Sequence, residues 1–263
     1  MAKIHFLGTC SGTEPMAGMH HTSIVIEVGE YYYWFDGGEG CAYTAHTSGM
    51  DVLRTKALFV SHPHLDHMAG LPNLFSCMRK LIWREKRSLK NDNTLEVFFP
   101  GLETFRAIKL VACSGNDSFK FLFKMNEHDL SEDGVIFEDE NVKVSAMHNC
   151  HLGEDGSNGW HSYSFLIEIG LMRIVYSGDV KTPTELDEFM EEGCDLFIME
   201  TGHHSVTDVC EYAMNRKVER LYFTHHGREI INNRPRAEKI IKRYSREAGI
   251  PITIASDMMT VEI

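Results

Sequence analysis

The chain has 263 residues, and 38 Asp and Glu against 26 Lys and Arg give it a formal net charge of −12. With 43% hydrophobic and 24% charged residues it is long and apolar enough for a large core, which excludes a disordered or collagen-like chain. The acidity argues against a broad nucleic-acid groove, which needs clustered Lys and Arg, but it allows a small anionic substrate held by local positive charge.

The predicted elements alternate between strands and helices along the whole chain. We expect strands at residues 3–7, 23–28, 31–35, 57–60, 95–99, 120–124, 142–147, 163–169, 172–176, 196–199, 221–223 and 252–255. Apolar residues stand at helical spacing between Val206 and Met214, after a Ser205 cap, and again from residue 237 to 244, after Pro235. The charged segment 79–93 is typical of a helix end followed by a solvated loop. This order predicts an α/β protein with two packed sheets and helices outside, in a single domain over residues 1–263.

The N-terminus and the cysteines favour a reducing compartment. The apolar run at the N-terminus is too short for a signal peptide, and no stretch approaches the roughly 18 apolar residues of a membrane span. The seven Cys are scattered and form no C-x-x-C pair, so neither a disulfide framework nor a Cys₄ zinc site is expected. We therefore expect a cytoplasmic protein without a membrane partner. The sequence leaves its oligomeric state open, a homodimer included.

The densest group of chemically active side chains follows the apolar strand at residues 57–60. His62, His64, Asp66 and His67 stand there in one short segment. In an extended segment His62 and His64 project to the same side and can share one metal ion, and a turn into a helix would aim Asp66 and His67 at a neighbouring ion. Imidazole and carboxylate ligands without thiolate suit zinc or another divalent metal such as manganese or iron. A His-rich surface loop is the alternative interpretation.

The unbroken H-x-H-x-D-H pattern over residues 62–67 resembles the signature of the metallo-β-lactamase superfamily. Residues 35–40, with their Asp-Gly-Gly-Glu-Gly turn, and residues 255–259 are similar to the ribonuclease Z-like branch of that superfamily. The resemblance extends over nearly the whole chain. It implies a four-layer αββα sandwich that holds two divalent metal ions, with zinc as the first candidate, at one edge of its sheets.

The resemblance also implies the remaining metal ligands. Asp179, in a Gly-Asp pair after a strand, matches the carboxylate that bridges both ions, and His225 matches the last His ligand. The third His of the family follows the strand at 142–147, where His151 is the preferred candidate and His148 the alternative. The first ion would then be held by His62, His64, His151 and Asp179, and the second by Asp66, His67, Asp179 and His225.

Three further residues are candidates for supporting these ligands. Asp36 would orient the His loop, while Glu200 and His226 would lie behind the ligands and contact them. The histidines without matching partners are expected to be structural or solvated. They are His5, His20, His21, His46, His128 and His161.

The candidate for proton transfer is His204, which stands next to Ser205 at the start of a predicted helix. It matches a His of ribonuclease Z-like enzymes that assists the leaving group or contacts the phosphate. A His near its normal pKa can protonate a leaving alkoxide at neutral pH, so we expect His204 or Asp66 to deliver that proton. The neighbouring His203 is a weaker candidate.

Together these features predict a dinuclear metal-dependent hydrolase, in which a metal-bound hydroxide attacks a small or cyclic phosphodiester or a nucleotide-type substrate. Relatives that process tRNA 3′ ends carry a long Gly/Pro-rich arm, whereas residues 153–159 lead quickly into the next strand here. This difference and the negative charge weigh against extended nucleic acid as a partner. The alternatives are tRNA 3′ processing and hydrolysis of a lactone, thioester or carboxyl ester at the same site. A di-iron redox protein would have Glu in place of His64 and a flavin domain, and a metal-free scaffold would have lost ligands.

Overall fold

The computed structural model describes residues 2–113, 121–153 and 160–263, and the chain divides into two compact units. Unit 1 comprises Met1–Ser131 and Asp257–Ile263, and unit 2 comprises Glu132–Ser256. Each unit is built on one seven-stranded sheet. The single domain expected from the sequence stays a prediction.

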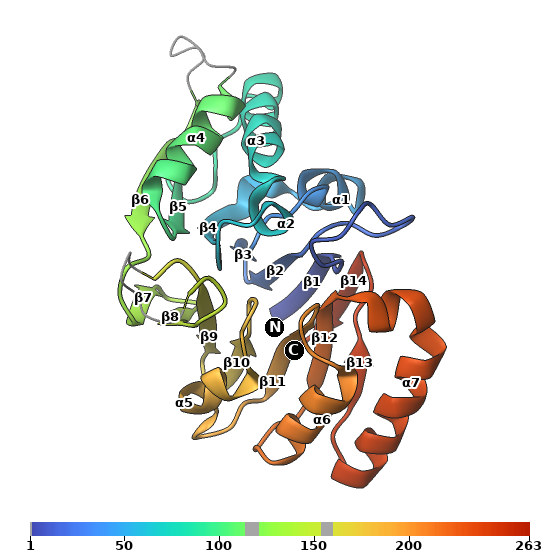
Figure 1. Cartoon of the computed structure of the whole chain (residues 1–263). Helices are drawn as coiled ribbons and strands as arrows, with labels where there is room; N and C mark the ends of the chain where they lie inside the picture. Colours follow the sequence, from blue (N-terminus) through green and yellow to red (C-terminus); the bar gives the residue numbers. More distant parts are fainter. Residues whose placement is uncertain (1, 114–120, 154–159) are drawn as a thin grey trace. The chain divides into compact units, whose positions relative to one another are not determined.

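The sheet of unit 1 has the strand order β14-β1-β2-β3-β4-β5-β6. Its strands are β1 (Ala2–Gly8), β2 (Ser23–Val28), β3 (Tyr31–Phe35), β4 (Thr55–Phe59), β5 (Thr94–Phe99), β6 (Lys124–Asp129) and β14 (Met259–Glu262). The pairings from β14 to β3 are antiparallel, and those from β3 to β6 are parallel. The last strand of the chain therefore pairs with the first, as the red and blue arrows of Figure 1 show.

Helices cover this sheet with apolar stripes. In α3 (Leu71–Glu85), Leu74, Phe75 and Met78 lie at successive helical turns and pack in one buried cluster with Trp34 and Leu58 of the sheet. Each such buried side chain stabilises the unit by roughly 2 kcal/mol relative to an exposed one. The other helical segments of unit 1 are α1 (Cys41–Thr47), η1 (Val52–Arg54), α2 (Leu65–Met68) and α4 (Leu102–Ala112).

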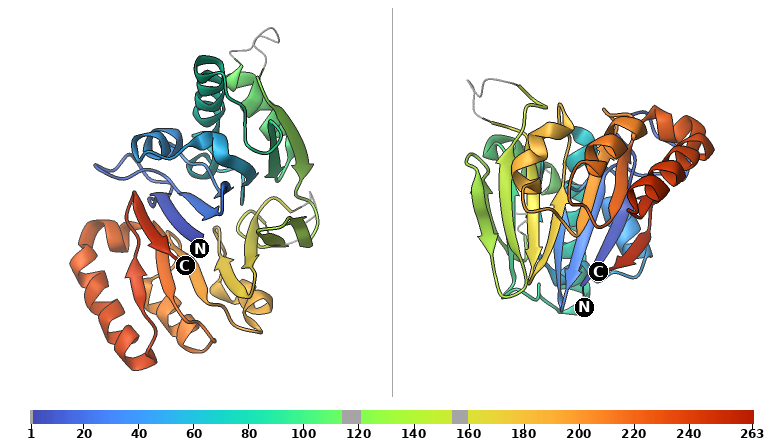
Figure 2. Two further views of the ribbon diagram at one scale, coloured as in Figure 1. Left: turned by 180° about the vertical axis from the view of Figure 1, so that it is seen from behind. Right: turned by 90° about the horizontal axis from the view of Figure 1, so that it is seen from below.

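The sheet of unit 2 has the strand order β13-β12-β11-β10-β9-β8-β7. In Figure 2 its strands change in colour from green at β7 to red at β13. Its strands are β7 (Gly134–Glu138), β8 (Lys143–His148), β9 (Tyr163–Ile169), β10 (Met172–Tyr176), β11 (Leu196–Thr201), β12 (Leu221–His226) and β13 (Ile252–Ile254). The strands β7 to β10 pair antiparallel, and β10 to β13 pair parallel. The helical segments are η2 (Pro183–Leu186), α5 (Asp187–Met190), α6 (Val206–Met214) and α7 (Arg228–Ala248).

In both units, candidate site residues directly follow the carboxyl ends of parallel strands, the edge at which open α/β sheets bind ligands. In unit 1, Asp36 follows β3 and the His loop follows β4, its parallel neighbour. In unit 2, Asp179 follows β10, and His225 is the second-to-last residue of β12. The sheet connectivity therefore brings residues that are far apart in the sequence to one edge within each unit.

The two sheets with flanking helices confirm the predicted α/β class. The strand predicted at 120–124 is wrong, because β6 begins at Lys124 and residue 120 lies outside the described residues. Strands β7 and β14 were not expected, since their side chains are exposed or half-buried and lack a continuous apolar pattern. The helix predicted after Pro235 begins earlier, at Arg228, and its backbone leaves helical geometry at Asn233. Among the described residues, no helix is both long and apolar enough to cross a membrane.

Candidate metal centre

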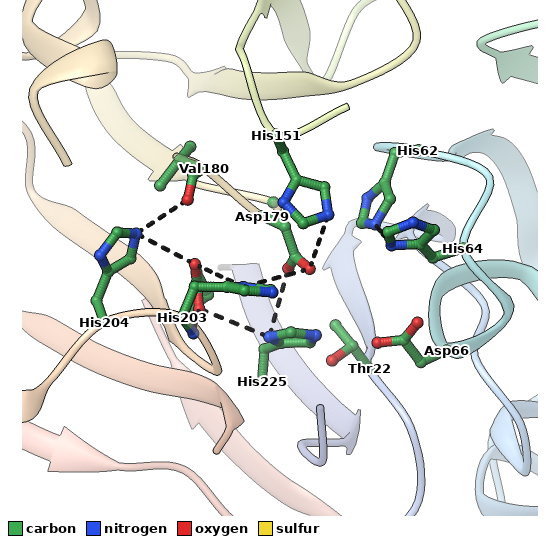
Figure 3. Close-up of polar contacts among 12 residues, drawn as sticks. Thr22, His62, His64, Asp66, His151, Asp179, Val180, His203, His204 and His225 are labelled. Carbon is green, nitrogen blue, oxygen red and sulfur yellow. Dashed lines mark hydrogen bonds and ion pairs between the residues drawn. The ribbon is translucent and has the colours of Figure 1, made fainter. Parts of the chain in front are cut away.

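The His loop of unit 1 runs from the end of β4 into α2 and has the conformation that its spacing predicts. His64 is extended, with φ −72° and ψ 149°, and the chain then turns into α2. His62 Nε2 lies 2.9 Å from His64 Nδ1, and Figure 3 shows the two rings facing each other. One turn further on, His67 Nε2 lies 3.4 Å from Asp66 Oδ2. Unit 1 thus presents two pairs of potential ligands, with His62, Asp66 and His67 buried.

Asp36 contacts the His loop through its carboxylate. Its carboxylate is fully buried and accepts hydrogen bonds from the Ser61 amide (2.7 Å) and the Ser61 hydroxyl (2.9 Å). The same carboxylate lies 2.8 Å from His67 Nδ1. A proton on Nδ1 would be donated to Asp36, so that Nε2 is the ring nitrogen of His67 that carries the lone pair with which a metal ion could be bound. Asp36 has a φ of 60°, a left-handed conformation that Asp tolerates better than most residues.

Asp179 is the centre of the polar cluster in unit 2. Three imidazole nitrogens approach its carboxylate: His225 Nδ1 at 3.4 Å, His151 Nε2 at 3.7 Å and His203 Nδ1 at 3.7 Å. Figure 3 shows the three rings around Asp179. Buried carboxylates are costly unless positive charge or hydrogen bonds compensate them, and a divalent cation among these groups would supply that compensation.

The two candidates for the third His have different partners. His151 faces Asp179, and its backbone amide is held by Asn149 Oδ1 at 3.1 Å. His148 instead has Nδ1 2.6 Å from Asp133 Oδ2, and its ring stacks on Trp160 with 3.9 Å between ring centroids. Asn149 is a supporting residue that the sequence reasoning missed. Its only sequence signal is its place between the two histidines.

Glu200 is fully buried beside Asp179 and organises the histidines that follow it. It accepts from the His203 amide (2.9 Å), and its Oε1 lies 3.1 Å from His203 Nδ1. Burial alone would raise the pKa of Glu200, but the hydrogen bonds from His203 and His225 outweigh it and lower that pKa. Conversely, the hydrogen bond to Glu200 raises the pKa of His203 above its ordinary value. Asp179, Glu200, His203 and His225 each offer a donor atom, all within 4.8 Å of one another.

His203 and His204 have different environments. His204 Nε2 lies 2.9 Å from the backbone oxygen of Val180 and 3.3 Å from Glu200 Oε1, and its side chain is only 10% exposed. The His203 side chain is 44% exposed and faces Asp179. The sequence analysis favours His204 over His203 as the proton donor. In the structure, however, His203 is the more accessible of the two imidazoles and lies beside Asp179. Two adjacent histidines in one turn carry no sequence signal that would tell them apart.

His226 has a structural environment. Its Nε2 lies 2.9 Å from the Ala255 backbone oxygen, and its Nδ1 lies 3.3 Å from Thr201 Oγ1. Burial lowers the pKa of His226 to about 4, so the ring is neutral at physiological pH and ties β12 to the chain after β13. The contacts of His226 are therefore with β11 and with the chain after β13, and its support of the metal ligands stays a prediction.

The donor atoms of each unit are imidazole nitrogens and carboxylate oxygens, without a thiolate. This chemistry fits zinc and other divalent first-row metals, and the partners of His67 and His225 are those that usually orient metal-binding imidazoles. The candidate ligands are distributed as four in unit 1 (His62, His64, Asp66 and His67) and three in unit 2 (His151, Asp179 and His225). Polar side chains that could bind metal are therefore present at the strand ends of both units.

Comparison with known proteins identifies the family. The family model of the anti-Pycsar protein Apyc1 matches residues 2–241. The chain belongs to the Apyc1 family. A ribonuclease Z from Methanothermobacter thermautotrophicus is 23% identical over 320 residues, which cover 100% of this chain and 97% of the relative.

Solved structures show that this Apyc1-family chain has the metallo-β-lactamase fold. The metallo-β-lactamase fold protein YhfI from Bacillus subtilis has a TM-score of 0.76 at 17% identity and covers 100% of this chain and 99% of its own. The short form of human tRNase Z has a TM-score of 0.69 at 19% identity, with 99% of both chains covered. The predicted membership of the ribonuclease Z-like part of the metallo-β-lactamase superfamily is thus confirmed, and the chain is a metal-dependent hydrolase.

Proposed function

We propose that the protein is a dinuclear metal-dependent phosphodiesterase that acts on a small or cyclic phosphodiester or a nucleotide-type substrate. In this proposal His62, His64, His151 and Asp179 hold one divalent ion, and Asp66, His67, Asp179 and His225 hold the other. The observation that carries it is the set of imidazoles and carboxylates at the strand ends of each unit, with Asp36 behind His67 at 2.8 Å. Two ions of zinc, or of manganese or iron, would supply Lewis acidity and a nucleophile at neutral pH.

The residues around the ligands would fix their geometry before substrate arrives. Asp36 sets the ring orientation and the tautomer of His67 through Nδ1. Asn149 holds the backbone of His151, and its own Nδ2 donates to Ser164 Oγ at 3.1 Å. Ligands held in this way lose little freedom when a metal ion binds, which favours tight binding.

His203 is a third candidate, besides His204 and Asp66, for protonating the leaving oxygen. It is more exposed than His204, and its Nδ1 is held by Glu200, which leaves Nε2 available to substrate. The hydrogen bond to Glu200 raises the pKa of His203, which is the direction that suits a general acid. His204, with Nε2 on a backbone oxygen, would instead stabilise the turn that carries His203.

The preference for a small substrate rests on charge and length. The net charge of −12 repels an extended polyanion, which is bound by neutralising its phosphates. The alignment with the archaeal ribonuclease Z extends over 320 positions although this chain has 263 residues, so the relative carries insertions that this chain lacks. Residues 154–159, where the sequence suggests that a tRNA-binding arm is missing, lie outside the described residues. The relative's name keeps RNA processing as the second candidate function.

A substrate panel tests the proposal. The metal-loaded protein is assayed with bis-p-nitrophenyl phosphate, a cyclic nucleotide, a lactone, a p-nitrophenyl carboxyl ester and a tRNA precursor. We expect hydrolysis of the first two, and a loss of at least 100-fold in Asp66→Ala and His64→Ala, because each removes a ligand. The matched control is His128→Ala, since His128 lies on β6 and contacts Glu96 and Phe98; it should keep wild-type activity.

Three outcomes would contradict the proposal. Activity that survives both ligand substitutions would exclude the assigned metal site. Turnover of the lactone or carboxyl ester alone would assign carboxyl-ester chemistry to the same residues. Efficient cleavage of the tRNA precursor without turnover of the small phosphodiesters would favour RNA processing.

A further inference from the structure

In unit 1, the base of the loop between β1 and β2 (residues 9–22, here the β1–β2 loop) is held by a backbone bridge between Cys10 and His21 and by a carboxylate from the other end of the chain. Asp257 Oδ1 accepts from the Thr9 amide (2.9 Å) and the Thr9 hydroxyl (2.8 Å). Its Oδ2 accepts from the His20 amide (2.6 Å) and lies 3.1 Å from His20 Nδ1. Since Thr9 and His20 stand near the two ends of the loop, Asp257 joins both ends. Hydrogen bonds to an ionised carboxylate are among the stronger ones in proteins.

Gly12, near the start of this loop, lies directly against Asp66. A Cβ at Gly12 would come within 2.8 Å of Asp66 Oδ2 and 2.9 Å of Asp66 Cγ, distances that real Cβ atoms essentially never show. Only a glycine at position 12 therefore leaves the carboxylate where it is. The backbone of the loop at Gly12 therefore limits the positions that the Asp66 carboxylate can take.

A second contact holds the backbone of Asp66. Gly38 lies against the Asp66 carbonyl oxygen on one side, and a Cβ at Gly38 would lie 2.8 Å from His21 Cβ on the other. The Gly38 amide donates to the Thr22 carbonyl at 2.9 Å, which links this turn to the end of the β1–β2 loop. Asp66 therefore has two close contacts with unit 1: Gly12 lies against its carboxylate, and Gly38 lies against its backbone carbonyl oxygen.

We propose that Asp257 is a positioning residue for Asp66, acting through the β1–β2 loop that it closes. This inference rests on the proposed function, because it assigns Asp66 to the second metal ion. Without the Asp257 carboxylate, Thr9 and His20 lose their common partner, only the backbone bridge between Cys10 and His21 closes the base of the loop, and the loop holds its position beside Asp66 less tightly. The Asp66 carboxylate would then sample more orientations, and a metal ion that uses it as a ligand would bind more weakly.

The test is a metal titration of the full-length apoprotein, with a chelating indicator that resolves two binding affinities. Asp257→Asn keeps the shape of the side chain but places an amide group opposite the His20 donors. Gly12→Ala keeps the hydrogen bonds of Asp257 to Thr9 and His20 and changes the contact between the loop and the Asp66 carboxylate directly. Asp51→Asn is the matched control, since Asp51 is also an Asp of unit 1 that accepts from a backbone amide, at Leu53 (3.2 Å), and pairs with Arg87.

We expect the wild type and Asp51→Asn to bind two equivalents of zinc with the same two affinities. Asp257→Asn and Gly12→Ala should keep one affinity and weaken the other by about 10-fold, the usual scale for residues behind metal ligands. The melting temperature of each apoprotein separates this effect from a general loss of stability. If Asp257→Asn does not fold, Gly12→Ala and Thr9→Val, which removes one of the four hydrogen bonds, test the same prediction.

Two results would overturn the inference and are distinguishable. If the wild type binds two ions and Asp257→Asn and Gly12→Ala bind both with wild-type affinity, Asp257 has a structural role only, and the proposed function is unaffected. If the wild type itself binds fewer than two ions, the dinuclear function and this inference are both wrong.

Discussion

His148 and His151 stand three residues apart at the end of β8, yet their side chains have different partners. The carboxylate of Asp133 and the ring of Trp160 hold His148, whereas His151 faces Asp179 across 3.7 Å. The direction of each side chain depends on the turn that follows the strand. Asn149 holds this turn, because its backbone N–H donates to the Ser162 carbonyl at 2.9 Å.

This difference predicts opposite effects of two similar substitutions. His151→Ala should reduce the bound metal to about one ion per chain or less, because a ligand of the proposed site is lost. His148→Ala should keep the wild-type metal content and lose roughly 1 kcal/mol of stability, because it removes one aromatic stack and one ion pair. Elemental analysis of dialysed protein and urea unfolding measure the two effects. A metal-depleted His148→Ala beside a fully loaded His151→Ala would reverse the assignment.

At the scale of elements, β1, β2 and η1 are joined by a polar cluster on the sheet of unit 1. Glu27 on β2 accepts from Arg54 Nη2 of η1 at 2.8 Å and lies 2.9 Å from His5 Nε2 of β1. Burial raises the pKa of Glu27, but the hydrogen bonds from His5 and Arg54 outweigh it and lower that pKa below 4.5. A carboxylate with a lowered pKa in the folded state stabilises the fold wherever it is ionised.

This cluster predicts a pH-dependent stability difference. The contribution of Glu27 should be complete above its unfolded pKa and should disappear as the pH falls through its lowered folded pKa. Glu27→Gln should therefore cost at most about 1 kcal/mol at pH 7, because the pair is partly exposed, and less at acidic pH. Urea unfolding of wild type and variant between pH 7 and pH 3 measures this. Glu30→Gln, an exposed neighbour paired with Lys90, is the control, and a difference that grows on acidification would contradict the account.

How much of the site the sequence predicts depends on how local its geometry is. The relation of His62 to His64 follows from an extended segment and could be derived from spacing alone, whereas Asp179 and His225 required the family resemblance. The ranking of His203 and His204 depends on which ring the turn after β11 exposes, and spacing does not contain that information. The role of Asp257 was beyond sequence reasoning, because its partners Thr9 and His20 are 248 and 237 positions away.

The same distinction applies to the fold. Core strands such as β11, whose residues are all buried, carry continuous apolar patterns and were predicted. The strands β7 and β14 were missed because they end their sheets and have exposed side chains, so pairing with a neighbour rather than burial defines them. The break of α7 at Asn233, two residues before Pro235, explains why the sequence pattern marked only the second part of that helix.

At the scale of the whole molecule, the central claim is that ligands from both units bind two metal ions through a shared Asp179. Each unit contributes too few of the proposed ligands to complete two four-coordinate sites by itself. Two divalent cations would also offset part of the net charge of −12, at the buried carboxylates of the proposed site.

The measurement that tests this claim most directly is the metal stoichiometry of the purified protein, determined by inductively coupled plasma mass spectrometry, in wild type and Asp179→Ala. We predict about two divalent ions per wild-type chain and a loss from both sites in Asp179→Ala, since one carboxylate serves both ions. Two ions retained in Asp179→Ala, or a wild-type protein that binds one ion or none after metal loading, would contradict it.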